Sequence, residues 1–210
     1  MWGTTVFGGA HDNGTVFKIT PSGDLMTMYS FCAEAACADG AEPYAGLIEG
    51  SDGSFYGATV YGGANGYGVI FSVDSGGGLS TLHSFCQEAG VCADGYFATA
   101  GLVQDTNGTF YGTTNYGGTG GGTIFSFSIG SKAFVRALPA SGPAGTAVDI
   151  LGTDLNDASS VTFNGLPAVF QVVSGTEITT QVPAGATTGK IEVVTPGATL
   201  KSNADFRVPQ

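Results

Sequence analysis

Short runs of alternating apolar and polar residues, separated by glycine-containing turns, fill the first 130 residues of the chain. In residues 25–31, for example, Leu25, Tyr29 and Phe31 share one side of the alternation. An alternation with a period of two predicts β-strands, and the glycine turns between them predict hairpins. No stretch of ten or more residues combines a helical apolar period with capping residues at its ends. The pattern therefore predicts an all-β fold.

One motif organises this region, because it occurs three times at a step of 54 or 55 residues. Phe-Tyr-Gly-Ala-Thr-Val-Tyr-Gly-Gly at residues 55–63 returns in similar form at 110–118, and a related stretch occupies residues 1–9. A repeat of this length predicts an array of similar β-units. The strands predicted for the complete repeats span residues 14–20, 25–31, 45–50, 54–61, 68–74, 79–85, 100–105 and 109–116. Residues 122–128 open a third repeat that does not continue.

Aromatic residues at matching positions of the repeats predict how the units pack. Phe17, Phe71 and Phe125 coincide, as do Phe31 and Phe85. Burying each such phenylalanine between neighbouring units would contribute roughly 2–3 kcal/mol to stability. The repeated glycines are expected to supply the positive φ angles of tight turns.

Four short strands in a unit of about 54 residues match the size of a propeller blade. The region contains ten predicted strands, or about two and a half blades, whereas propellers close with ~4–8 blades. An open arc of blades exposes apolar end faces and strand edges. We therefore expect copies of the chain to associate as a homo-oligomer through the end faces of the repeats.

The recurring motifs also resemble a known family. Phe-Tyr-Gly-Thr-Thr, Gly-Gly, Gly-Thr-Val-Phe, Leu-x-Thr-Leu-x-Ser-Phe-Cys and Cys-Ala-Asp-Gly are similar to the Gloeobacter/Verrucomicrobia-type tandem repeat of bacterial secreted and surface-anchored proteins. The resemblance covers residues 1 to about 130 and implies an extracytoplasmic, propeller-like domain, which we place at residues 1–131. It implies no set of catalytic residues.

The composition changes after Ser131, where glycine thins and β-branched residues become more frequent. Strand-like runs are predicted near residues 147–151, 160–163, 168–173, 177–182, 190–194 and 204–208. About seven strands in roughly 75 residues predict a small β-sandwich. The segments at residues 161–168 and 178–185 resemble the IPT/TIG family of immunoglobulin-like domains, over residues 134–208. This resemblance implies a spacer or interaction module and transfers no binding residue.

Four cysteines form two pairs, each just after a Ser-Phe step of its repeat. The simplest pairing joins Cys32 to Cys37 and Cys86 to Cys92. A metal site is the alternative, although the spacing is not Cys-x-x-Cys and no histidine flanks either pair. Disulfides favour an oxidising compartment, so we expect an extracellular or cell-surface location.

The charge balance limits the partners. The net charge is −11, from 17 acidic and 6 basic residues, so the chain should repel nucleic acid and anionic membranes. No segment reaches the ~18 apolar residues of a membrane helix, and no membrane insertion is expected. Because Met1 occupies the place of Phe55 and Phe110, we expect a piece of a longer array, and the expected location is that of the parent protein.

Groups suited to catalysis are few. His11 and His83 take positions that Asn65 and Tyr29 hold in the neighbouring repeat, which indicates structural roles. Two such histidines give little support to a Ser-His-Asp triad, and no pair of carboxylates stands out for glycoside hydrolysis. We therefore predict no catalytic residues and favour a protein that is not an enzyme.

Two aspartates recur in the Cys-Ala-Asp-Gly loops. Asp39 and Asp94 fit either a turn-forming Asp-Gly or a ligand for a cation or a sugar. The oxygen-rich turns at residues 51–53 and 105–108 lack the bidentate glutamate of an EF-hand, so we expect hairpin turns there. No cofactor is expected, with Ca²⁺ as the one candidate ion.

The remaining binding candidates are aromatic residues in or beside loops, namely Tyr44, Tyr61, Tyr67, Tyr96, Phe97 and Tyr116. Together with Asp39 and Asp94, the predicted ligand-binding residues are Tyr44, Tyr61, Phe97 and Tyr116. Aromatic platforms with Asn and Asp nearby hold neutral sugars by stacking and hydrogen bonding. The alternative interpretation is that these rings cover the turns of the blades.

Two functional hypotheses follow. The first is a secreted or cell-surface, non-catalytic scaffold or adhesion protein, with polysaccharide or a surface protein as partner and the Ig-like module as a spacer. The second is a glycan-active enzyme or carbohydrate-binding module, with its site on one face of an oligomer-closed propeller.

Overall fold

The computed structural model describes residues 1–87 and 92–209, and it separates into two compact units. One unit comprises Met1–Gln104 and Phe110–Phe127, and the other comprises Asp105–Thr109 and Ser128–Gln210. The predicted all-β fold is confirmed: apart from the single 3₁₀ turn η1 (Ala35–Cys37), the described elements are strands. Among the described residues, no helix is long and apolar enough to cross a membrane.

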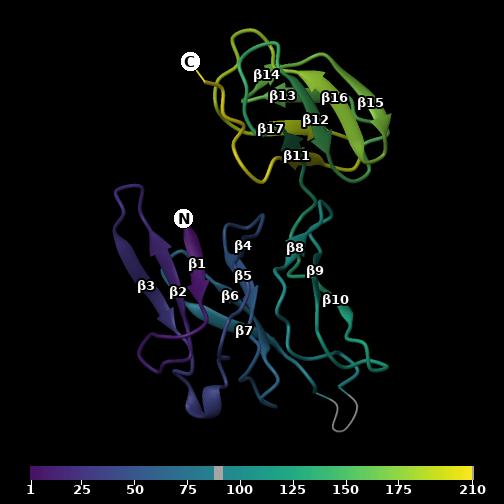
Figure 1. Cartoon of the computed structure of the whole chain (residues 1–210). Coiled ribbons are helices and arrows are strands. Elements are labelled where there is room, and N and C mark those ends of the chain that lie inside the picture. Colours follow the sequence, from purple (N-terminus) through teal and green to yellow (C-terminus); the bar gives the residue numbers. More distant parts are fainter. Residues whose placement is uncertain (88–91, 210) are drawn as a thin grey trace. The chain divides into compact units, whose positions relative to one another are not determined.

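The repeat unit contains three antiparallel sheets, drawn from purple to teal in Figure 1. The first sheet is formed by β1 (Trp2–Thr5), β2 (Thr15–Ile19) and β3 (Leu25–Ser30). The second is formed by β4 (Ile48–Glu49), β5 (Phe55–Ala58), β6 (Val69–Val73) and β7 (Leu79–Ser84). The third is formed by β8 (Val103–Gln104), β9 (Phe110–Thr113) and β10 (Ile124–Phe127).

Each sheet spans a repeat boundary. The second sheet takes β4 and β5 from the end of one sequence repeat and β6 and β7 from the start of the next. The first and third sheets each contain three of the four strand types, so the ten strands are divided as three, four and three. The hairpin turns predicted at residues 51–53 and 105–108 join β4 to β5 and β8 to β9, as expected.

Recurring phenylalanines pack against one another between neighbouring sheets. Phe31 packs edge-on against Phe71 with ring centroids 5.1 Å apart, and Phe85 packs in the same way against Phe125 at 5.3 Å. Phe31, Phe71 and Phe85 are buried, which confirms the predicted packing between units. Phe17 and Phe125, in the outer sheets, are only half-buried.

The glycine of the Phe-Tyr-Gly motif has a different role from the one predicted. Gly57 lies within β5 and is not among the residues with positive φ. A Cβ atom at this position would lie 2.7 Å from Cζ of Phe71 and 2.9 Å from Cδ2 of Leu47. Gly57 therefore makes room for the packed ring, whereas Gly62 and Gly63 do supply the positive φ angles of the following turn.

The second unit is a sandwich of two four-stranded antiparallel sheets. One sheet contains β11 (Arg136–Leu138), β12 (Ala147–Leu151), β15 (Phe170–Ser174) and β16 (Glu177–Gln181). The other contains β13 (Ser160–Phe163), β14 (Leu166–Pro167), β17 (Ile191–Val194) and β18 (Thr199–Lys201). Alternate residues of both sheets, such as Ile150 and Phe163, form one buried core.

The strands predicted for the C-terminal unit need correction, because β11, β14 and β18 lie outside the predicted runs. The strand expected at residues 204–208 is absent, because these residues form only isolated bridges, between Phe206 and Gly189 and between Arg207 and Ser141. Among the described residues, the last strand is β18 (Thr199–Lys201), which follows the Pro196-Gly197 turn. Phe206 still contributes to the core, where its ring lies 5.2 Å from that of Phe163.

Candidate functional site

The two cysteine loops are closed by local disulfides. Cys32 is bonded to Cys37 and Cys86 to Cys92, which is the simplest pairing that the sequence allows. All four cysteines have positive φ angles, a conformation that non-glycine residues rarely adopt. The disulfides therefore hold a backbone shape that would otherwise be unfavourable.

Asp39 anchors the first cysteine loop from within. Its buried carboxylate accepts hydrogen bonds from the Tyr29 hydroxyl at 2.8 Å and from the backbone N–H groups of Ala33 and Glu34 at 3.0 and 3.2 Å. Burial, followed by the hydrogen bond to Asp39 and its negative charge, raises the pKa of Tyr29 well above its ordinary value. The carboxylate therefore accepts hydrogen bonds from its own loop and from the preceding strand β3.

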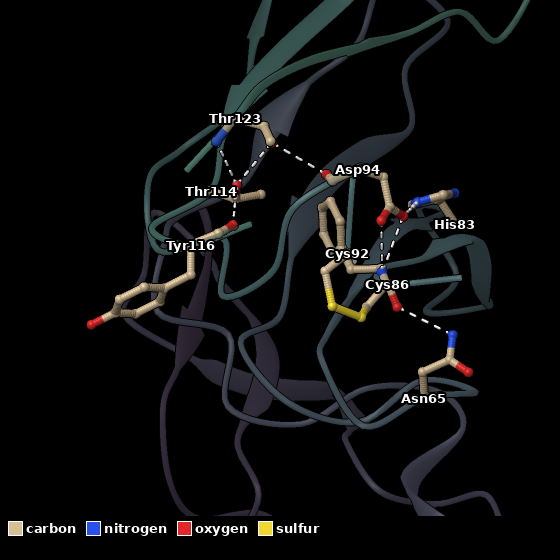
Figure 2. Close-up of a disulfide and its surroundings, with 9 residues drawn as sticks. Asn65, His83, Cys86, Cys92, Asp94, Thr114, Tyr116 and Thr123 are labelled. Atoms are coloured by element: carbon tan, nitrogen blue, oxygen red, sulfur yellow. Dashed lines mark hydrogen bonds and ion pairs between the residues drawn. A yellow bond between two sulfur atoms is a disulfide. The ribbon is translucent and has the colours of Figure 1, made fainter. Parts of the chain in front are cut away.

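Asp94 has the same place in the second loop. Its carboxylate lies 2.9 Å from Nε2 of His83 and accepts the backbone N–H of Cys86 at 3.0 Å (Figure 2). Thr123 donates to the backbone carbonyl of Asp94 at 3.2 Å, which connects the loop to the segment entering β10. The geometry gives His83 a loop-anchoring contact, and a ligand role for Asp39 or Asp94 remains a prediction.

Five aromatic side chains meet beside the second cysteine loop. This aromatic cluster consists of Tyr61, Tyr67, Tyr96, Phe97 and Tyr116. Tyr96 stacks on Tyr116 with centroids 5.5 Å apart, and Phe97 packs edge-on against Tyr61 at 5.0 Å. Tyr61, Tyr67 and Tyr116 are exposed, so the cluster forms an aromatic surface that solvent can reach.

Backbone hydrogen bonds bring the cluster together from distant parts of the chain. Tyr96 and Tyr116 form an antiparallel bridge, with N–O distances of 2.9 and 3.3 Å. Asn115 donates to the carbonyl of Phe97 at 3.1 Å, and Phe97 donates to the carbonyl of Tyr67 at 3.5 Å. The backbone hydrogen bonds that join these loops to one another therefore also position the rings.

The preceding repeat builds the same backbone with different side chains. Ala41 bridges to Tyr61 at 2.8 and 3.1 Å, and Glu42 donates to the carbonyl of Asn13 at 2.9 Å. Ala41, Glu42 and Asn13 thus occupy the places of Tyr96, Phe97 and Tyr67. Glu42 and Phe97 even share a positive φ, at 56° and 59°. The backbone of this junction accordingly does not require aromatic side chains.

Polar groups border the aromatic surface. Asn115 is exposed next to Tyr116 in the sequence, and its Oδ1 accepts a hydrogen bond from Thr99 Oγ1 at 3.1 Å. An amide and a hydroxyl beside exposed rings can form hydrogen bonds with the hydroxyl groups of a stacked sugar. The predictions from the sequence do not single out Thr99 or Asn115. Comparing the repeats could have drawn attention to Asn115, because the preceding repeat has the apolar Val60 at the equivalent position.

Tyr44, another predicted ligand-binding residue, does not belong to the aromatic cluster. Tyr44 is exposed, and the described ring contacts of the cluster do not include it. Among the described residues, no group of three or more His, Cys, Asp or Glu side chains could hold a metal ion. Ca²⁺ binding therefore remains a prediction without a defined site.

Two family models match the chain. The Gloeobacter/Verrucomicrobia repeat family matches residues 1–166, and the IPT/TIG domain matches residues 134–208. A comparison with curated proteins gives no match. A solved structure described as a novel fungal alcohol oxidase of the AA5 family in complex with copper aligns at 11% identity and a TM-score of 0.37. The alignment covers 94% of this chain and 48% of that one, so the chain spans about half its length, and at this TM-score it carries no functional argument.

Proposed function

The chain belongs to the Gloeobacter/Verrucomicrobia repeat family and carries an IPT/TIG domain, and from this we propose that it is a non-catalytic adhesion protein that binds neutral polysaccharide outside the cytoplasm. The β-repeats are the scaffold that presents the aromatic cluster, and the Ig-like domain is a spacer. Two disulfides in loops of this size favour an oxidising, extracytoplasmic environment.

One observation supports the binding proposal: the two repeat junctions share a backbone, yet only the second has aromatic side chains at the places that Asn13, Ala41 and Glu42 occupy in the first. Because Asn13, Ala41 and Glu42 suffice at the first junction, the rings of Tyr67, Tyr96 and Phe97 exceed what folding demands. An exposed aromatic patch of this kind marks an interaction site.

The class of ligand follows from charge and from the groups beside the rings. A chain with a net charge of −11 disfavours anionic polymers. Aromatic faces with tyrosine hydroxyls, Asn115 and Thr99 at the border suit a ligand that is apolar on its faces and rich in hydroxyl groups at its edges. A neutral polysaccharide has this character, because pyranose rings present C–H faces and equatorial hydroxyl groups.

Affinity electrophoresis through gels containing xylan, mannan or mixed-linkage β-glucan tests the proposal. We expect retardation by at least one of these polymers, and at least about a tenfold loss of affinity in Tyr116→Ala, on the scale of an interface anchor. Phe7→Ala is the matched control, since Phe7 is exposed at the equivalent position two repeats earlier and lies outside the aromatic cluster. Equal losses in both variants, or no retardation by any neutral polymer, would contradict the proposal.

The same assay addresses the alternative function. A glycan-active enzyme would release new reducing ends from the polymer that retards it, whereas a binding protein leaves the polymer intact. Retention by a purified surface protein with no retention by polysaccharide would instead favour an adhesion protein for a protein partner.

A further inference from the structure

The third sheet of the repeat unit has one covered face and one bare face. Along β9 and β10 the residues alternate between buried or half-buried positions and exposed positions. Phe110 and Phe127 lie on the covered face, where their rings stack with centroids 5.0 Å apart. The opposite face carries Val103, Tyr111 and Ile124, all exposed. We call these three residues the Ile124 face.

The second sheet shows what normally covers such a face. Ile70 has the position of Ile124, and it is 2% exposed against 82% for Ile124. Tyr56 has the position of Tyr111, and it is 3% exposed against 37%. Tyr56 is covered by the third sheet, where the ring of Phe110 lies 4.5 Å away. The Ile124 face is thus apolar in the same pattern but lacks the sheet that buries it.

The contact between the first and second sheets repeats this arrangement. Trp2 has the position of Tyr56, and its ring stacks on Phe55 at 4.4 Å. In both cases the covering residue is a phenylalanine at the start of the next sheet's Phe-Tyr-Gly strand. The partner that fits the Ile124 face is therefore another repeat sheet, presenting the side on which Phe55 and Phe110 lie.

The first sheet exposes that complementary side. Met1 has the position of Phe55, and it is exposed. Leu25 is 66% exposed, whereas Leu79 at the equivalent position packs against the core between the first two sheets. Phe17 is half-buried, whereas the equivalent Phe71 is fully buried. We call Met1, Phe17 and Leu25 the Leu25 face.

We propose that the Ile124 face of one copy of this chain docks on the Leu25 face of a second copy, head to tail. The contact reproduces the sheet stacking that occurs twice within the chain. Two copies supply six sheets, which lies within the ~4–8 blades of closed propellers. A ring of two copies makes this heterologous contact twice and leaves neither face bare.

Sedimentation velocity of the full chain tests the proposal. We expect a species of twice the 21.0 kDa monomer mass. Ile124→Asp and Leu25→Asp should each weaken dimerisation at least about 30-fold, the effect of losing an interface anchor. Both side chains are exposed in the monomer, so the circular dichroism spectrum should not change, and Ile124→Ser serves if the charged variant fails to fold. Val169→Asp, an exposed site in the Ig-like unit, is the control that should dimerise normally.

A mixing experiment separates head-to-tail docking from other dimers. An equimolar mixture of Ile124→Asp and Leu25→Asp contains one intact pair of faces, so dimers should reappear. A dimer formed by two Ile124 faces would instead survive in Leu25→Asp alone. A wild-type monomer at all accessible concentrations, a dimeric Ile124→Asp variant, or no dimer in the mixture would overturn the proposal. Polysaccharide binding is read separately, so failure here leaves the proposed function testable.

Discussion

The hydroxyl of Tyr29 donates a 2.8 Å hydrogen bond to the carboxylate of Asp39, and the equivalent pair in the next repeat is His83 and Asp94 at 2.9 Å. Both aspartates also accept backbone N–H groups from the start of their cysteine loop. A phenol and an imidazole thus perform one structural task at matching positions. This interchange explains His83 without assigning it to catalysis.

Replacing Asp39 with asparagine should destabilise the repeat unit. The variant turns one carboxylate oxygen into an N–H donor, which then faces the backbone N–H of Ala33 at Oδ2 or that of Glu34 at Oδ1. We expect a loss of about 1–3 kcal/mol in the free energy of unfolding, measured by urea denaturation. Glu49→Gln, at an exposed position of the same unit, is the control. A loss no larger than that of the control would refute the anchoring role.

Gly57→Ala should also destabilise the chain, because the new methyl group would overlap Phe71. We expect a loss of about 1–3 kcal/mol, typical of overpacking. Gly46→Ala is the matched control, since a Cβ there would meet nothing within 4 Å. Phe71→Leu combined with Gly57→Ala should lose less than the sum of the two single changes. Strict additivity would show that the two positions do not compete for space.

Stability should fall in alkaline solution through Tyr56. Burial, followed by the 2.8 Å hydrogen bond to Asp52 and its charge, raises the pKa of Tyr56 to about 12, above the ~10 of an unfolded tyrosine. The folded state therefore favours the neutral phenol, so this contribution is complete below pH ~10 and is lost as the pH rises toward the folded pKa. Urea denaturation across this range should give a flatter curve for Tyr56→Phe than for the wild type. Some slope should remain, because the pKa of Tyr29 is raised too.

Removing the first disulfide should lower stability moderately. Cys32 and Cys37 close a short loop of sequence separation 5. The double variant Cys32→Ser, Cys37→Ser should lose about 2 kcal/mol in the chain-entropy model. Thermal denaturation with and without dithiothreitol measures the effect, and the variant should be less sensitive to the reductant than the wild type. Unchanged sensitivity would mean that this bond contributes little.

The strands could be predicted from the sequence because their signals are local. Alternation and glycine turns place β6, β7, β12 and β13 within a residue or two of their observed bounds. The sequence does not show which four consecutive strands form one sheet, because a tandem repeat can be divided into units at any of its turns. The second and third sheets begin with β4 and β8, in the middle of the sequence unit.

The candidate site was only partly predictable, because its parts meet through long-range contacts. The sequence indicates all five residues of the cluster as loop aromatics. Their meeting depends on the Tyr96–Tyr116 bridge and on the positive φ of Phe97, and neither has a local sequence signal. The sequence alone shows that the two junctions carry different side chains. Only the structure shows that both junctions have the same backbone hydrogen bonds, so that the aromatic side chains are not needed to form the junction.

The most direct test uses a variant in which the second junction carries the side chains of the first. The variant Tyr67→Asn, Tyr96→Ala, Phe97→Glu carries the side chains that the preceding repeat uses on the same backbone. Affinity electrophoresis on a retarding neutral polysaccharide, with urea denaturation of the same sample, reads binding and folding together. We expect a cooperatively folded protein that the polymer no longer retards. Undiminished retardation, or a chain that fails to fold because the rings belong to its core, would contradict it.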